Sequence, residues 1–231
     1  MKDEDVDDVI ARAARGTSSV DPALLERISQ TIGSSLQPVK PLPSSWLLTT
    51  ALCTVCVGVA ICGALVLGAH GFQLMSPVQI GLIFPVLGML AVMAAALYVD
   101  EMIPGSRRWL APWALVAAAS LIMIAVFALL FHDYGIIRFL PQGLICLKAG
   151  LLEALPVALA GWWILHRGFA VNSIAAGIAQ GTLAGLAGVS MLELHCVDFQ
   201  APHQMLWHTS ILPITGAAGA LFAWTRQNRS H

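Results

Sequence analysis

The sequence predicts an all-α fold: an integral membrane bundle of six transmembrane helices, preceded by a short helical arm in the cytoplasm. Hydrophobic residues make up 58% of the 231 residues and charged residues only 11%, whereas soluble domains carry about 25% charged residues. Six apolar runs follow one another, and a helix needs roughly 20 such residues to cross a bilayer. Aromatic residues mark many ends of these runs, as they do at membrane interfaces. These observations argue against a soluble globular protein.

The chain divides into an arm, residues 1–45, and a membrane domain, residues 46–231. It opens with acidic residues where a secretory signal peptide would be basic, and the first apolar run begins only near Trp46. The predicted spans cover residues 46–69, 80–98, 110–131, 144–165, 173–192 and 209–224. The last run is short, and it crosses the bilayer if its flanking side chains snorkel.

The distribution of Lys and Arg predicts the orientation of the bundle. With six spans, ten of the 12 basic residues fall on one side, namely Lys2, Arg12, Arg15, Arg27, Lys40, Arg107, Arg108, Arg167, Arg226 and Arg229. The other side has only Arg138, and Lys148 lies within a span. Because basic loops stay in the cytoplasm, we expect both chain ends to be cytoplasmic.

The arm contains two predicted amphipathic helices followed by a proline-rich tether. The second helix has Asp21 as N-cap and Pro22 at its first position, which is a common start signal. The apolar residues predicted to bind a partner are Val6, Val9, Ile10, Leu24, Leu25, Ile28 and Ile32. Helices this short are marginal in water by themselves, and an acidic arm with an apolar stripe suits the groove of a basic protein. A solvated, partly disordered tail is the alternative. The net charge of −1 gives no reason to expect direct binding of nucleic acid.

The five cysteines fall into two groups by predicted depth. Cys53, Cys56 and Cys62 lie within the first span, where cysteine usually behaves as a small hydrophobic residue. Cys146 and Cys196 lie at the outer ends of the fourth and fifth spans. Their compartment permits a disulfide between them.

Histidines gather near the outer cysteines. His195, His203 and His208 follow the fifth span together with Glu193 and Asp198. Thiolates and imidazoles suit zinc or another thiophilic heavy-metal ion, so Cys146, Cys196 and these three histidines form the candidate metal set. Interfacial histidines beside a structural disulfide are the alternative.

Two further features lie within the spans. Lys148 and Glu153 are polar residues in the fourth span and should face protein or water. Gly177, Gly181 and Gly185 recur every four residues in the fifth span. Small residues at this period allow helices to approach closely, within the bundle or in a homodimer.

Several short motifs together resemble the NrsF family of six-helix anti-sigma factors in the bacterial inner membrane. The motifs are the Cys-Leu-Lys-Ala-Gly sequence from Cys146, Pro156, Arg167 with Gly168, the glycine-rich fifth span, and the segment from His195-Cys196 to Trp207-His208. The resemblance covers roughly residues 80–224. It implies that the N-terminal segment sequesters an extracytoplasmic-function sigma factor. It also implies that two outward-facing cysteines, here Cys146 and Cys196, sense heavy metal or oxidative stress. The arm is longer than the family pattern and has its own two-helix organisation.

We therefore expect a membrane-embedded anti-sigma factor that is not an enzyme, with the lipid bilayer and a sigma factor as partners. A small transporter or metal-handling membrane protein is the first alternative, although Glu153 and Lys148 are the main polar groups for a path across the membrane. A membrane thiol oxidoreductase using Cys146 and Cys196 is the second. It would ordinarily need another cysteine pair on the same face.

Overall fold

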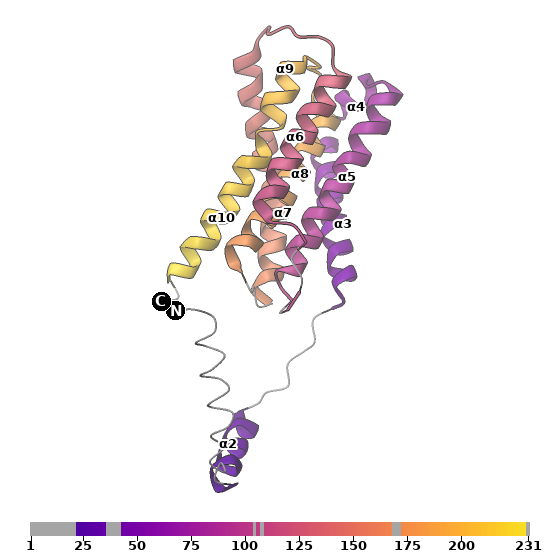
Figure 1. Ribbon diagram of the computed structural model, residues 1–231. Helices are drawn as coiled ribbons and strands as arrows, with labels where there is room; N and C mark the ends of the chain where they lie inside the picture. Colours follow the sequence, from indigo (N-terminus) through magenta and orange to yellow (C-terminus); the bar gives the residue numbers. More distant parts are fainter. Residues whose placement is uncertain (1–21, 36–42, 104, 107–108, 168–171, 230–231) are drawn as a thin grey trace, which may run out of the picture. The chain divides into compact units, whose positions relative to one another are not determined.

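The computed structural model describes residues 22–35, 43–103, 105–106, 109–167 and 172–229, and its chain forms two units (Figure 1). The described part of the first unit is the helix α2, Pro22–Ser35. It begins at the predicted proline. Ile28 on this helix is 45% exposed, and the Thr31 hydroxyl donates to the Arg27 carbonyl. The other predicted arm helix, with Val6, Val9 and Ile10, lies outside the described residues, as do the side chains of Leu24, Leu25 and Ile32.

The second unit is a helical bundle. Its elements are α3 (Ser45–Leu67), α4 (His70–Leu74), α5 (Pro77–Asp100), α6 (Pro112–Leu130), α7 (Phe139–Arg167), α8 (Ser173–His195), α9 (Ala201–His203), the π-helix η1 (Gln204–His208) and α10 (Ile211–Arg229). Six helical stretches are long and apolar enough to cross a membrane, the last running from Ala201 to Asn228. The prediction of an all-α bundle with six such helices is confirmed, and it suggests a multi-pass membrane protein.

Helix α8 is the centre of the bundle. Within its most apolar window 78% of the residues are buried, compared with 28–39% in the other five candidate spans. It packs against α10, α7, α5, α3 and α6. Nine of its 23 residues are Gly or Ala, and these small residues let several neighbours approach its backbone.

Glycines set the closest approaches to α8. A Cβ atom at Gly177 would run into the carbonyl oxygen of Gly219 on α10, and one at Gly181 would run into that of Thr215. Gly185 lies against the Thr215 hydroxyl. The regular glycine spacing in α8 is thus used within the chain, against α10.

A second close approach joins α8 to α7. A Cβ atom at Gly188 would run into the Gly150 carbonyl oxygen, so the two backbones are in contact there. Cys146 lies one helical turn before Gly150 on α7, and Cys196 lies two turns beyond Gly188 at the end of α8. Because the two helices are antiparallel (Figure 1), this contact brings both cysteines to the same end of the bundle.

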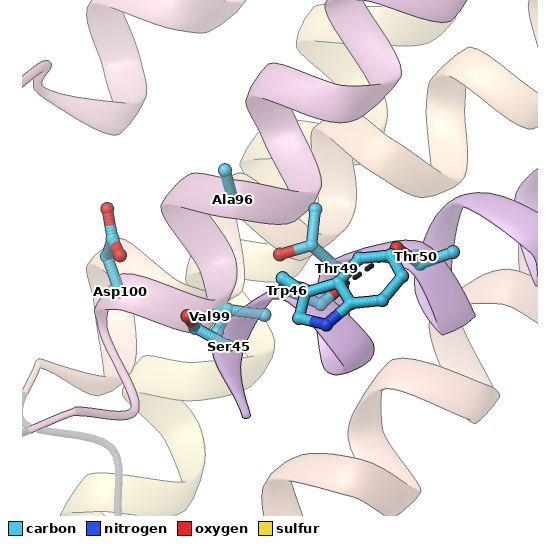
Figure 2. Close-up of a pocket in the computed structure, with 7 residues that line it drawn as sticks. All are labelled: Ser45, Trp46, Thr49, Thr50, Ala96, Val99 and Asp100. Carbon is cyan, nitrogen blue, oxygen red and sulfur yellow. Dashed lines mark hydrogen bonds between the residues drawn. The ribbon is translucent and has the colours of Figure 1, made fainter. Parts of the chain in front are cut away.

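The two ends of the bundle differ in character. Helix α3 begins and α10 ends at one end, whereas α4 and α9 lie at the other (Figure 1). A depression of about 300 Å³ lies where α3 begins and α5 ends, between Trp46, Thr49 and Asp100 (Figure 2). The Asp100 carboxylate accepts a hydrogen bond from the Trp109 indole. With one carboxylate and mostly hydroxyl and apolar neighbours, this depression offers little chemistry.

Candidate metal centre

The two thiols that the sequence predicts to face outward lie in contact. Cys146 on α7 and Cys196, directly after α8, are 9% and 6% exposed, and their sulfur atoms are 3.8 Å apart. Both thiols are free. The hydrogen bond with Cys146, together with burial, raises the pKa of the Cys196 thiol above its usual range. The close backbone approach at Gly150 and Gly188 explains how residues 50 positions apart meet.

Two histidines complete the group through an unusual helical turn. His203 ends α9 and His208 ends the π-helix η1, and both are fully buried. In a π-helix the hydrogen bonds run from i to i+5, so residues five apart lie one above the other, whereas an α-helix would turn them well apart. Their rings accordingly make an edge-to-face contact with centroids 5.2 Å apart. The Nε2 atom of His203 lies 3.7 Å from the Cys196 sulfur.

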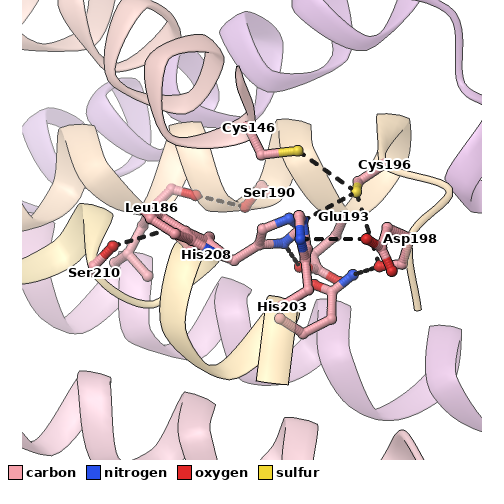
Figure 3. A network of polar contacts seen from close by, with 11 residues as sticks. Cys146, Leu186, Ser190, Glu193, Cys196, Asp198, His203, His208 and Ser210 are labelled. Atoms are coloured by element: carbon pink, nitrogen blue, oxygen red, sulfur yellow. Dashed lines mark hydrogen bonds and ion pairs between the residues drawn. The ribbon is translucent and has the colours of Figure 1, made fainter. Parts of the chain in front are cut away.

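A carboxylate lies next to the Nδ1 atom of each histidine (Figure 3). Glu193 Oε1 lies 2.6 Å from His208 Nδ1, and both residues are buried. Asp198 Oδ2 lies 3.4 Å from His203 Nδ1. The loop holding Asp198 is fixed in turn, because its carbonyl accepts from the Gln204 amide and its carboxylate accepts from the Gln200 backbone N–H. The sequence shows both carboxylates near the histidines, but only the fold pairs each one with its own ring.

The ligand atoms of Cys146, Cys196, His203 and His208 all lie within 4.8 Å of one another. Two sulfur and two imidazole nitrogen atoms are a donor set that suits zinc and other thiophilic ions. Four of the five predicted metal ligands therefore come together. The fifth, His195, has its Nδ1 atom 2.8 Å from the Gly68 carbonyl oxygen and its ring near that of His70.

The remaining predicted residues lie elsewhere. Lys148 is exposed on α7. Glu153 is half-buried on the same helix, and its carboxyl group faces Gly63 of α3 closely enough that a Cβ there would collide with it. On α3, Cys56 is buried with its sulfur 3.7 Å from the Leu183 carbonyl, Cys53 is half-buried, and Cys62 is exposed.

Comparison with known proteins identifies the family. The sequence model of NrsF, described as negative regulator of sigma F, matches residues 33–226. The chain belongs to this family. The resemblance predicted from the motifs around Cys146, Cys196 and His208 is thereby confirmed, and membership supports a regulatory role on a sigma factor. Neither the curated proteins nor the solved structures contain a match to the chain.

Proposed function

We propose that the protein is a membrane-embedded anti-sigma factor of the bacterial plasma membrane. Residues 1–36 of its cytoplasmic arm sequester an extracytoplasmic-function sigma factor, and both chain ends are cytoplasmic. Membership of the family of negative regulators of sigma F is the observation that carries this proposal. Six helices able to cross a membrane support the location.

The arm supplies the sigma-binding surface in this proposal. Helix α2 exposes Ile28. Exposure of this apolar side chain to water is unfavourable, and its burial in a partner's groove would be favourable. The opening residues are acidic and would attract a basic surface of the sigma factor.

The outer end of the bundle supplies the sensor in this proposal. A metal ion or oxidant acts on Cys146 and Cys196, which are buried side by side next to two histidines. A ligand shifts a conformational equilibrium only by binding two states unequally. Because Cys146 belongs to α7 and Cys196 ends α8, the stimulus changes how these two helices pack. Helix α8, in contact with six other helices, passes the change toward the cytoplasmic end.

Capture of the sigma factor by the full-length chain in detergent micelles tests the binding step. We expect the wild-type chain to retain the sigma factor and Ile28→Asp to weaken retention at least tenfold, because a charge replaces the apolar contact. Gln30→Asp is the matched control: it adds the same charge to the same helix two positions away, on another face, and should leave retention unchanged. Equal retention by wild type and Ile28→Asp would contradict the role of this stripe, and no retention by wild type would contradict the proposal.

A sigma-dependent reporter in cells tests the sensing step. Cys146→Ser and Cys196→Ser should each abolish induction by thiophilic metal or oxidant while repression in unstressed cells persists. His195→Ala should respond like wild type. Normal induction in both cysteine variants would refute the sensing role, even if sigma-factor capture succeeds.

A further inference from the structure

We propose that Cys146, Cys196, His203 and His208 form a closed tetrahedral zinc(II) site, filled in the resting protein and supported by Glu193 and Asp198. The inference deepens the sensing part of the proposed function and rests on it only for the regulatory meaning of the site. Zinc binding itself follows from the contacts of these six residues.

Two distances between the donor atoms match the edges of a tetrahedron around zinc. With Zn–S of about 2.3 Å and Zn–N of about 2.0 Å, tetrahedral angles place two sulfurs about 3.8 Å apart and a sulfur and a nitrogen about 3.5 Å apart. The Cys146 and Cys196 sulfurs are 3.8 Å apart, and Cys196 Sγ lies 3.7 Å from His203 Nε2. The four donor atoms all lie within 4.8 Å of one another, so side-chain movements of about 1 Å would complete the tetrahedron.

The carboxylates present the correct nitrogen of each ring. An ionised carboxylate only accepts hydrogen bonds, so the contact of Glu193 Oε1 with His208 Nδ1 places the proton on Nδ1 and leaves the Nε2 lone pair available. That Nε2 atom is fully buried and has no hydrogen-bond partner among the described residues. Asp198 Oδ2 lies 3.4 Å from His203 Nδ1 without forming a hydrogen bond, and Nε2 of that ring faces the Cys196 sulfur. Carboxylate–histidine–metal arrangements of this kind fix the tautomer and the ring orientation in zinc proteins.

Charge and burial favour zinc(II) held permanently. Two thiolates cancel the charge of a divalent ion, which makes a buried site tolerable, and two imidazoles complete the coordination that zinc prefers. All four ligands are buried and all belong to the protein, as in structural zinc sites and unlike catalytic sites with an open position.

The site joins separate elements. Cys146 comes from α7, Cys196 from the end of α8, His203 from α9 and His208 from η1. Zinc would hold these elements together, and a thiophilic ion that replaces it and binds the two sulfurs in another geometry would shift α7 against α8, which loss of the ion alone would not do. The regulatory signal is then exchange of the bound ion.

Metal analysis of the purified full-length chain in micelles tests the site. After incubation with zinc(II) and removal of the excess, we expect one zinc per chain in wild type and in His195→Ala, a histidine of the same segment outside the site. Cys146→Ser and His208→Ala should bind at least 100-fold more weakly. Cobalt(II) should give the intense visible absorption of a tetrahedral thiolate site in wild type and lose it in Cys146→Ser.

The orienting carboxylates provide the second measurement. Glu193→Gln and Asp198→Asn keep all four ligands and should weaken zinc affinity about 10- to 100-fold while still binding one ion at saturation. Wild type without stoichiometric zinc, or His208→Ala with wild-type affinity, would overturn the proposal. Sigma-factor capture by the same preparations separates this outcome from failure of the proposed function, because capture without zinc would leave the anti-sigma role standing.

Discussion

Cys53 and Cys56 on α3 lie in very different surroundings from Cys146 and Cys196, which are called the outer pair after the side of the membrane predicted for them. The α3 pair is three residues apart on one helix, and the Cys56 sulfur lies in the apolar core with its polar contact to the Leu183 carbonyl. The outer pair is 50 residues apart, yet its sulfurs touch beside two histidines. Among the described residues no cluster of His, Cys, Asp or Glu includes the α3 pair. The distance between two cysteines in the sequence therefore says little about what their thiols can bind. The polar groups that the fold brings next to them determine it.

The largest expected effect concerns the buried polar groups that distinguish the outer region. Glu193→Leu removes the acceptor of His208 Nδ1 inside a site where both residues are buried. Breaking a buried pair in this way should lower the free energy of unfolding by about 3–5 kcal/mol. Unfolding in mixed micelles, followed by tryptophan fluorescence, measures the change.

The matched control lies in the α3 region. Thr54→Leu removes an exposed hydroxyl that donates to the Thr50 carbonyl, and it should change the free energy of unfolding by less than about 0.5 kcal/mol. Equal losses of unfolding free energy in the Glu193 and Thr54 variants would mean that the buried polar groups around Glu193 do not stabilise one another.

The next effect concerns the backbone contact that brings the outer thiols together. In Gly188→Ala the new Cβ meets the Gly150 carbonyl, so α7 must move away from α8. Overpacking of this kind should cost about 1–3 kcal/mol. It should also reduce cross-linking of Cys146 to Cys196 by a short bifunctional thiol reagent.

Gly58→Ala on α3 should change stability in the opposite direction to Gly188→Ala. A Cβ at Gly58 meets no atom within 4 Å, and Ala is favoured over Gly in a helix by up to about 1 kcal/mol. We therefore expect a slight gain in stability and unchanged cross-linking. A comparable loss in both variants would show that the approach at Gly188 is not what positions the thiols.

Sequence reasoning was sufficient for the helices because each span is a long apolar run with marked ends. The predicted span 80–98 extends in the structure to Pro77–Asp100, since Ser76 and Gln79 form a capping box at its start. The last predicted span, 209–224, becomes the stretch from Ala201 to Asn228. The residues gained at its start include His203, Gln204 and His208. Because these side chains are polar, the hydropathy of the sequence does not reveal that they belong to a buried helical segment.

The site was only partly predictable for a related reason. The residue types and their predicted side of the membrane are enough to identify Cys146, Cys196 and three histidines as candidate metal ligands. The π-helical turn of η1 decides which histidines are used, since it brings His203 and His208 to one side. No spacing rule for an α-helix predicts that pairing. His195, nearest to Cys196 in sequence, instead meets the Gly68 carbonyl.

The smallest expected effect belongs to the α3 thiols. The double variant Cys53→Ala, Cys56→Ala removes a sulfur with one weak contact and another that is half-buried, so the loss of stability should be about 1 kcal/mol. The sigma-dependent reporter should keep its full response to thiophilic metal. The same double substitution at Cys146 and Cys196 should abolish that response at comparable protein levels. If the α3 variant also lost the response, the stimulus would have to act on thiols within the membrane, and the polar surroundings of the outer pair would no longer explain where the signal is read.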